Sequence, residues 1–329
     1  MKITAVIVTY SNRAEYLSQV VGECLSQGVD KVIIIDNGSP IDNQKQIKAI
    51  KTLYTEERIV IHTNKKNEGS APGFALGIRM AIKQSNNDDW LLVLDDDNKL
   101  DTGAVSYLRS LAEDNTYNNA YCCLRSDREH YIRYLETHDK KILLGAPNTF
   151  VYFSFTGFIK NKLSCEKQLP ILKRKNDEPI PCPCGPYGGL FMSVKAFKKA
   201  YSPNELLYLY FDDTEFTFRL VDQNIKLWLA PQARIFDIDK SWGNKKLSHK
   251  FSNQYFETDE LRIKYFFRNR VYLEKKYFVT KKHVYVFNMV IYMAILGVKA
   301  VLSGSIPRYR VIWKSVIDGW NFDKLNVTH

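Results

Sequence analysis

Cysteine is scarce in this sequence and follows no pattern typical of metal binding. The chain has six cysteines among 329 residues, and no CxxC spacing occurs. The cysteine spacing therefore argues against a disulfide-rich scaffold and against a structural zinc site. We expect reduced thiols in a cytoplasmic protein. The six positions are Cys24, Cys122, Cys123, Cys165, Cys182 and Cys184.

Glycine-rich phosphate-binding motifs are also missing. No GxGxxG follows the first apolar segment, and GxxxxGK[ST] occurs nowhere in the chain. These absences argue against a dinucleotide-dependent oxidoreductase and against a P-loop NTPase.

Long uninterrupted hydrophobic runs are lacking too. In the most apolar stretch, residues 284–303, Asn288 and Lys299 leave only the ten residues 289–298 between them, whereas a membrane span needs about 20 apolar residues. We expect a buried or interfacial helix there, able to dock shallowly onto an anionic leaflet. No small-residue cleavage site follows residues 3–9, so we expect no signal peptide and a location in the cytoplasm or on the inner face of the cytoplasmic membrane.

What the sequence does contain is typical of a folded protein with a large core. The chain is 45% hydrophobic and 13% aromatic, with a net charge of +11. Residues 240–282 hold twelve basic residues against four acidic ones. This basic stretch suggests a diphosphate-bearing partner or an anionic membrane, although a solvated charged surface explains it equally well. Nucleic acid is suggested by the net charge alone, and we expect no such partner.

Short β-branched runs alternate with amphipathic segments through the first hundred residues. This pattern predicts an α/β fold with a doubly wound, mostly parallel sheet, whose ligands bind beyond the carboxyl ends of the strands. We expect strands at 3–9, 31–35, 59–61 and 90–94, with a further strand at 227–230, and helices at 14–28, 41–56 and 74–84.

Three consecutive carboxylates, Asp95, Asp96 and Asp97, directly follow the fourth predicted strand. An acidic triplet is usually a solvated turn. At the end of a buried strand, however, the three charges repel one another unless a cation or donor hydroxyls lie between them. In extended geometry Asp95 and Asp97 project to one side and Asp96 to the other. The pattern fits Mg²⁺ or Mn²⁺ held by one or two carboxylates, with diphosphate oxygens completing its shell.

A second acidic group, Asp212-Asp213-Thr214-Glu215, begins a predicted helix. Acidic residues in a first helical turn often serve only the helix dipole. The functional alternative is that one carboxylate accepts a proton from an attacking hydroxyl.

Polar residues also follow the first three strands, where a nucleotide would bind. Asp36 is placed to accept from a base or ribose donor, Tyr10 to stack and Arg13 to meet phosphate. Taken singly, each fits ordinary turn chemistry or surface charge. The full set is Thr9, Tyr10, Arg13, Asp36, Asn64 and Gly69.

Taken in order, these motifs resemble the inverting glycosyltransferases of family 2, which have the GT-A fold. The resemblance spans residues 3 to about 275. The motifs are Val8-Thr9-Tyr10-Ser11-Asn12-Arg13, Ile35-Asp36-Asn37-Gly38-Ser39, Asn67-Glu68-Gly69, Leu94-Asp95-Asp96-Asp97-Asn98, Tyr187-Gly188-Gly189 and Phe211-Asp212-Asp213-Thr214-Glu215-Phe216. The triple Asp, the second acidic motif and Tyr265-Phe266-Phe267-Arg268-Asn269-Arg270 further resemble the galactofuranosyltransferase and rhamnosyltransferase branch.

The resemblance implies a role for each matching residue. Asp95 and Asp97 would hold the metal diphosphate, Asp96 would help with the ribose or donor sugar, and Asp213 would be the catalytic base. Thr9, Arg13 and Asp36 would contact the nucleotide. On the acceptor side the expected residues are Gly188, Gly189, Asp212 and Trp242.

The sequence departs from that branch at one metal ligand. The branch carries a His some two dozen residues after the base, following an aromatic residue, and here Asp237 stands at that point. Asp is an acceptable oxygen ligand for Mg²⁺ or Mn²⁺, so we expect Asp237 to join the metal site, with Asp239 and His249 in reserve.

The expectation is therefore a metal-dependent inverting glycosyltransferase. It would use a nucleoside-diphosphate sugar, preferably galactofuranose and otherwise rhamnose, and a glycan or lipid-diphosphate-linked acceptor. We expect a nucleotide-sugar half at 1–120, an acceptor half of the same domain at 121–240 and a basic helical region at 241–329. Two alternatives remain open: a sugar nucleotidyltransferase, although residues 9–13 lack the expected glycines, and a non-catalytic glycan- or membrane-binding module.

Overall fold

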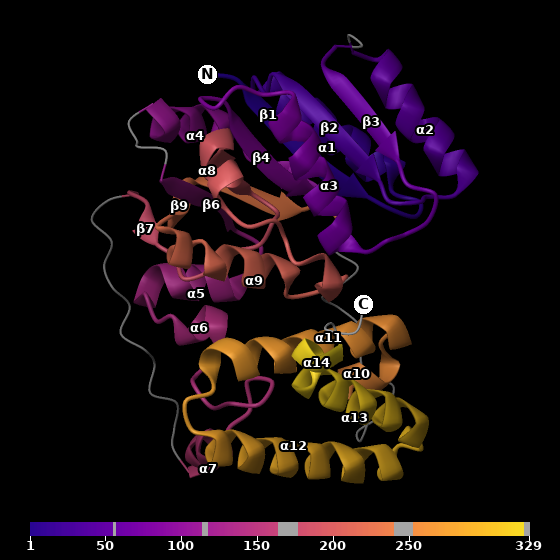
Figure 1. Cartoon of the computed structure of the whole chain (residues 1–329), viewed down its shortest axis with the longest axis vertical. Helices are drawn as coiled ribbons and strands as arrows, with labels where there is room; N and C mark the ends of the chain where they lie inside the picture. The colour runs from indigo at the N-terminus through magenta and orange to yellow at the C-terminus, as the bar shows by residue number, and fades with distance from the viewer. Residues whose placement is uncertain (55–56, 114–117, 164–176, 240–252, 326–329) are drawn as a thin grey trace. The chain divides into compact units, whose positions relative to one another are not determined.

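The computed structural model describes residues 1–54, 57–113, 118–163, 177–239 and 253–325. The chain divides into two compact units. The sheet unit comprises residues 1–143, 171–208 and 212–240, and the helical unit comprises residues 144–170, 209–211 and 241–329. Figure 1 shows both along the chain.

The sheet unit is built on one mixed sheet with the strand order β3-β2-β1-β4-β8-β6-β9-β5, and β7 pairs with β9. Strands β1, β2, β3 and β4 are parallel to one another, as are β6 and β9, whereas β8, β5 and β7 pair antiparallel with their neighbours. The strands are β1 Ile3–Thr9, β2 Lys31–Asp36, β3 Ile59–Thr63, β4 Trp90–Asp95, β5 Asn98–Leu100, β6 Asn119–Arg125, β7 Ile180–Pro181, β8 Leu190–Ser193 and β9 Lys226–Asp237. The predicted α/β class with a mostly parallel sheet is confirmed.

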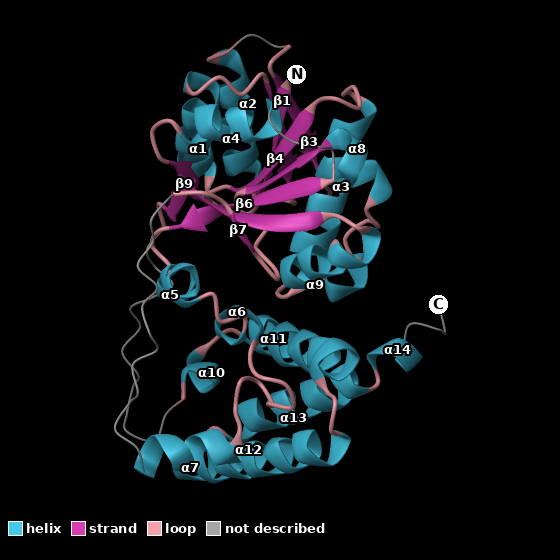
Figure 2. Cartoon of the chain, turned by 90° about the vertical axis from the view of Figure 1, so that its left-hand side faces the viewer, coloured by secondary structure: helices cyan, strands magenta, loops and turns pink. Residues whose placement is uncertain are grey.

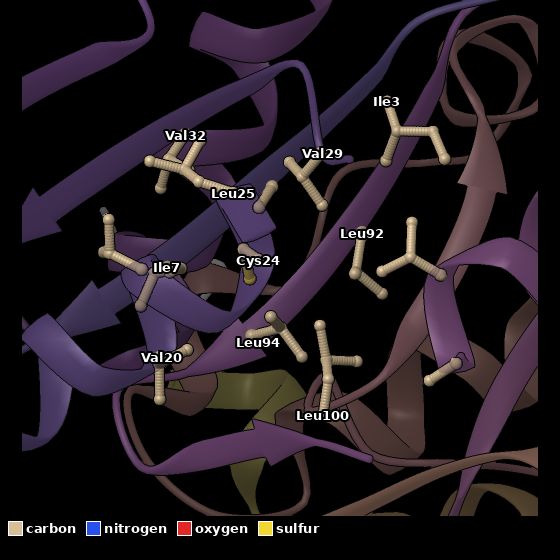
Figure 3. Packing of buried hydrophobic residues seen from close by; sticks show 14 of the residues in the cluster. Ile3, Ile7, Val20, Cys24, Leu25, Val29, Val32, Leu92, Leu94 and Leu100 are labelled. Atoms are coloured by element: carbon tan, nitrogen blue, oxygen red, sulfur yellow. The ribbon is translucent and has the colours of Figure 1, made fainter. Parts of the chain in front are cut away.

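Helices cover the sheet because alternate residues of its central strands point to opposite faces. Ile7 of β1 and Leu94 of β4 join the core formed with Val20 and Cys24 of the first helix (Figure 3). On the other face α3 lies close to β1, where Gly77 leaves room for Val6. The helices of this unit are α1 Ala14–Ser26, α2 Ile41–Thr52, α3 Ser70–Lys83, α4 Ala104–Glu113, α5 Glu129–Thr137, α6 Lys141–Leu144, α8 Val194–Lys199 and α9 Asp212–Arg219, with short 3-10 turns η1 Glu205–Leu207 and η2 Val221–Gln223.

The predicted elements differ from the observed ones mainly at their ends. Helix α3 begins at Ser70 rather than residue 74, because Pro72 is tolerated in a first helical turn, where its missing N–H has no intrahelical partner. Strand β9 is longer than the predicted 227–230 and extends to Asp237. Its register with β6 shifts between Cys123 and Leu124.

The helical unit is an all-α cluster (Figure 2). Its elements are α7 Phe155–Leu163, α10 Gln254–Glu257, α11 Glu260–Leu273, a π-helical turn η3 Glu274–Phe278, α12 Lys282–Leu302, α13 Ile306–Trp320 and α14 Phe322–Leu325. Its core joins Phe267 of α11, Leu296 of α12 and Ile312 of α13. Helix α12 is long and apolar enough to cross a membrane by length and composition alone, a test that core helices also pass.

Candidate active site

The ends of β1, β2 and β4 bring three predicted site residues to one edge of the sheet. Thr9 lies opposite Asp36 in the β1–β2 register, and Val8 lies opposite Asp95 in the β1–β4 register. Parallel strands present their carboxyl ends at the same edge. The nucleotide-side residues and the acidic triplet therefore meet there.

Arg13 binds three carboxylates at this edge. Its guanidinium donates to Asp96 at 2.8 Å, to Asp97 at 2.7 Å and to Asp239 at 2.8 Å. Thr9 Oγ1 also donates to Asp96, at 2.6 Å. Burial raises the pKa of Asp96 to about 6, although the charge of Arg13 opposes this shift. Arg13 thus holds the acidic loop in place instead of pointing away from it.

Asp95 differs from its two neighbours because its carboxylate is not engaged. No hydrogen bond or ion pair reaches it from any residue that the structure describes. Burial, together with the charge of Asp97, raises the pKa of Asp95 to about 7. A half-buried carboxylate without a hydrogen-bond or ion-pair partner is stabilised by a bound cation.

Asp237 lies opposite Asn98 in the β5–β9 pair, and Asn98 donates to it at 2.9 Å. The guanidinium groups of Arg125 and Arg128 also pair with Asp237. Burial lowers the pKa of Arg125, but the charges of Asp237 and Asp95 outweigh this and raise it above its usual value. The position predicted as a metal ligand is thus an arginine partner in this structure.

The second acidic motif forms the first turn of α9. Asp212 is buried and accepts from Ser70 Oγ at 3.0 Å. Asp213 accepts from the Thr214 backbone N–H at 2.6 Å. Burial raises the pKa of both carboxyl groups. Asp213 is half-buried, so hydrogen-bond donors and nearby positive charge stabilise its ionised, proton-accepting form.

The two acidic groups lie within electrostatic reach of each other. Burial is the largest cause of the raised pKa of Asp95, and the negative charge of Asp213 is a smaller one. The charge of Arg125 lowers the pKa of both Asp95 and Asp213. Arg125 is therefore a site residue that the sequence reasoning missed. Its sequence signal is a basic residue at the end of the apolar segment 120–124.

The nucleotide side contains buried polar atoms without partners. Asp36 is fully buried, and one of its oxygens accepts from the Ser39 N–H at 3.0 Å. Its other oxygen, Oδ2, and the Ser39 hydroxyl make no hydrogen bond within the described residues. Such atoms are costly unless a ligand satisfies them. Tyr10, at the end of β1, is 39% exposed.

Asn64 and Gly69 are tied to this region through Asn37. Asn64 donates to Asn37 Oδ1 at 3.0 Å, and the Asn37 amide donates to the Gly69 carbonyl at 2.8 Å. The sequence reasoning gave Asn37 no role of its own. The structure shows that it holds the loops after β2 and β3 together.

Gly188 and Gly189 lie just before β8. A Cβ at Gly188 would be 2.8 Å from Asp95 Oδ2 and would also meet Asn98. A Cβ at Gly189, where φ is +91°, would be 2.6 Å from the Cβ of Cys123. Both glycines therefore leave room for side chains of the sheet. The predicted acceptor residue Trp242 and the reserve ligand His249 lie outside the described residues.

The fit of the site to a divalent ion rests on Asp95. No group of three or more His, Cys, Asp or Glu side chains in the described part of the chain forms a ready-made metal cage. The unengaged Asp95 carboxylate, with Asp97 two residues on, fits a cation that takes its remaining ligands from phosphate oxygens.

Comparison with known structures identifies the fold. The chain matches a structure of GalNAc-T7 with UDP, GalNAc and Mn²⁺ with a TM-score of 0.54 and 15% identity, over 82% of this chain and 47% of that one. It matches the mannosyltransferase PcManGT from Pyrobaculum calidifontis, in complex with GDP-Man and Mn²⁺, with a TM-score of 0.54 and 11% identity, over 97% of this chain and 85% of that one. The chain thus spans about half the length of the first of these. No similar sequence is found among curated proteins.

The sequence itself matches a family. The model for "Glycosyl transferase family 2" matches residues 4–198, which is more than half of the chain. This range includes β1 to β4, the acidic triplet and both glycines before β8. The chain therefore belongs to glycosyl transferase family 2, a family of glycosyltransferase enzymes.

Proposed function

We propose that this protein transfers a sugar from a nucleoside-diphosphate donor to an acceptor hydroxyl with inversion at the anomeric carbon. The observation that carries the proposal is the meeting of two acidic groups around Arg125. One contains the unengaged Asp95 and the other contains Asp213. They come from segments more than one hundred residues apart in the sequence.

Asp213 is the proposed base. It takes the proton of the acceptor hydroxyl while the acceptor oxygen bonds to the anomeric carbon, and the bond from that carbon to the diphosphate oxygen breaks. Single displacement from the opposite side inverts the centre. The two products are the glycosylated acceptor and the free nucleoside diphosphate. Burial raises the pKa of Asp213, and the hydrogen bonds from Thr214 and then the charge of Arg125 oppose this rise and so favour its ionised form.

The remaining residues bind and orient the donor. The Asp36 oxygen without a partner and the Ser39 hydroxyl are available to polar groups of the nucleoside. Asp95 and Asp97 would hold Mn²⁺ or Mg²⁺, and such an ion supplies charge neutralisation of the departing diphosphate when bound. Arg13 holds Asp96 and Asp97 in the loop that carries these ligands. Mn²⁺ is the ion to test first, since both structural neighbours contain it.

We propose galactofuranose as the first donor sugar to test and rhamnose as the second, with a growing glycan or lipid-diphosphate-linked glycan as acceptor. The support is the likeness of the three motifs at residues 95–97, 212–216 and 265–270 to that branch. A thermal-shift screen against a panel of nucleotide sugars with Mn²⁺ tests the choice. The expected result is a rise in melting temperature with one donor and a smaller rise with its nucleoside diphosphate.

The decisive variant is Asp213→Asn, with Asp222→Asn, an exposed position on η2, as the matched control. Asp213→Asn should keep the donor affinity measured by calorimetry and lose at least about 100-fold in transfer rate. The control should match the wild type. Lost donor affinity at unchanged fold would move Asp213 to the donor-binding residues.

Chelation gives an independent check. Excess EDTA should abolish transfer and added Mn²⁺ should restore it, because the diphosphate leaves poorly without a cation. Full turnover in EDTA would remove the metal from the mechanism. Formation of a nucleotide sugar from a nucleoside triphosphate and a sugar phosphate would instead identify a nucleotidyltransferase.

A further inference from the structure

Helix α12 of the helical unit is apolar on two opposite faces, and its inner face packs in the protein. Tyr285, Met293 and Leu296 are buried in the core shared with α11 and α13. The polar Asn288 is also satisfied there, since it accepts from the Phe155 N–H at 2.9 Å and donates to the Asn148 carbonyl at 2.8 Å. These contacts fix the helix against its own unit.

The outer face of α12 is apolar and exposed. Its members recur at about every turn of the helix and therefore lie along one side of it. They are Phe287, Val290, Ile295, Val298, Val301 and Leu302. No Asp, Glu, Lys or Arg belongs to this stripe, and Val290 and Val298 are 56% and 60% exposed.

Neighbouring elements extend this surface. Helix α13 adds the exposed Ile306, Trp313 and Ile317, and α7 adds the exposed Phe158 and Ile159. In Figures 1 and 2, α11 and α13 lie on the same side of α12. Phe155 of α7 packs edge-on against Phe287, and the rest of the stripe stays exposed. Contiguous exposed apolar surface of this kind marks a docking site.

A groove between α12 and α13 opens on the same surface. Its volume is about 520 Å³, and its lining is mostly apolar. Met289 and Met293 come from α12, and Trp313, Ile317 and Trp320 come from α13. Tryptophan at the margin of an apolar surface is typical of segments that rest at the boundary between lipid chains and headgroups.

The charge around this surface is mostly positive, although Asp318 follows Ile317 on α13 and Glu260 pairs with Arg308. Residues 281–317 contain six basic residues and no Asp or Glu. Lys281 and Lys282 stand exposed at the start of α12, and Arg310 and Lys314 stand exposed on α13 beside Trp313. An apolar face bordered mostly by positive charge fits a surface that is apolar inside and negative at its boundary.

We propose that the outer face of α12, with α13, docks the protein onto an anionic lipid bilayer. The helix lies in the interfacial layer and does not span it, because its inner face is committed to the core of the helical unit. A second copy of the chain is a poorer occupant, since two such faces would bring two mostly basic surfaces together.

The test uses the full chain and sedimented vesicles, either of phosphatidylcholine alone or of phosphatidylcholine with phosphatidylglycerol. The wild type should bind the anionic vesicles, and binding should weaken with added salt. Val290→Asp and Val298→Asp should each weaken binding about tenfold, because burying one Val side chain contributes about 1.5 kcal/mol. Val221→Asp is the matched control, because Val221 on η2 is 57% exposed.

Lys314→Gln tests the charge separately and should weaken binding about fivefold, since one basic residue near an anionic surface contributes about 1 kcal/mol. Melting temperatures of all variants should stay near that of the wild type, because each position is exposed. Wild type that fails to sediment with anionic vesicles, or Val298→Asp that binds as tightly as Val221→Asp, would overturn the proposal. A dimer in sedimentation equilibrium that Val298→Asp dissociates would overturn it in favour of self-association. Since no readout is enzymatic, failure here is distinct from failure of the proposed transferase.

Discussion

The sharpest stability prediction concerns Asn269, which supports the turn before α9. Asn269 is fully buried on α11, and its amide donates to the carbonyls of Leu209 at 2.7 Å and Tyr210 at 2.9 Å. Tyr210 and the next residue, Phe211, have φ values of +65° and +62°. Bulky residues rarely adopt this conformation, so the turn depends on its hydrogen bonds.

Asn269→Asp keeps the shape of the side chain but replaces two donors with an acceptor. It removes two hydrogen bonds of about 1 kcal/mol each and leaves two buried carbonyls facing a carboxylate, for a total loss of about 3–5 kcal/mol in the free energy of unfolding. Arg268 Nε donates to Asn269 Oδ1 at 2.8 Å, and the variant keeps an oxygen for this bond, so the loss comes from the two carbonyls.

Urea unfolding and hydrogen exchange of the peptide that contains residues 209–211 provide the measurements. Asn321→Asp is the matched control, because the Asn321 amide donates to a single carbonyl, Ile317, at an exposed position. This control should lose at most about 0.5 kcal/mol. The reasoning is refuted if Asn269→Asp unfolds within 1 kcal/mol of the control and the peptide keeps its protection.

Three further predictions concern the sheet unit. Gly189→Ala should lower the free energy of unfolding by about 3 kcal/mol, because the new methyl group overlaps a cysteine of β6. Gly28→Ala, at the same φ of +91° with no atom within 4 Å, should lower it by only about 1 kcal/mol. Equal melting temperatures of the two variants would contradict this. Arg13→Lys should lower the free energy of unfolding by about 2 kcal/mol, because one ammonium group cannot reach three carboxylates. Arg79 faces one exposed carboxylate, so Arg79→Lys should leave the free energy of unfolding unchanged. The transfer rate should fall as the pH is lowered through the pKa of Asp213. The fall should begin above the ordinary Asp range, because burial raises that pKa. A flat kcat/KM profile down to about pH 4 would contradict the role of Asp213 as base.

The sheet was readable from sequence because its central strands are buried on both faces. Residues 31–35 and 90–94 are continuous apolar runs next to turn-forming or acidic residues, and they became β2 and β4. The acidic positions at strand ends followed from the same pattern. The family likeness then added roles that no spacing alone supplies, and these roles remain predictions.

The partners of the acidic residues were not readable in this way. Arg125 meets Asp237 because β6 and β9 pair although they lie more than one hundred residues apart. Asp97 and Asp239 share Arg13 because the segments after β4 and β9 meet, where the Ile238 N–H donates to the Asp97 carbonyl at 2.9 Å. Local sequence carries no signal for which strand lies beside which, so the arginine that meets each carboxylate could not be assigned.

The assignment of residues 144–170 to the helical unit was also hidden. We expected an acceptor half at 121–240. Arg270, on α11 of the helical unit, instead binds Leu144 and Tyr152 of this stretch. Arg270 donates to the Leu144 carbonyl at 2.8 Å and to the Tyr152 hydroxyl at 3.1 Å, and it pairs with the buried Glu274. The motif at 265–270, which suggested a family branch, thus also has a structural role.

The route of the chain through the two units limits how the protein can be divided. The chain passes from the sheet unit into the helical unit at residues 144–170 and again at residues 209–211, and each time it returns to the sheet unit. A truncation after residue 240 would remove Asn269 and strip the support from the residues that lead directly into α9 and Asp213. The helical unit therefore cannot be replaced by exchanging one continuous segment, either in the laboratory or by recombination between genes. All three of its segments, 144–170, 209–211 and 241–329, would have to change together.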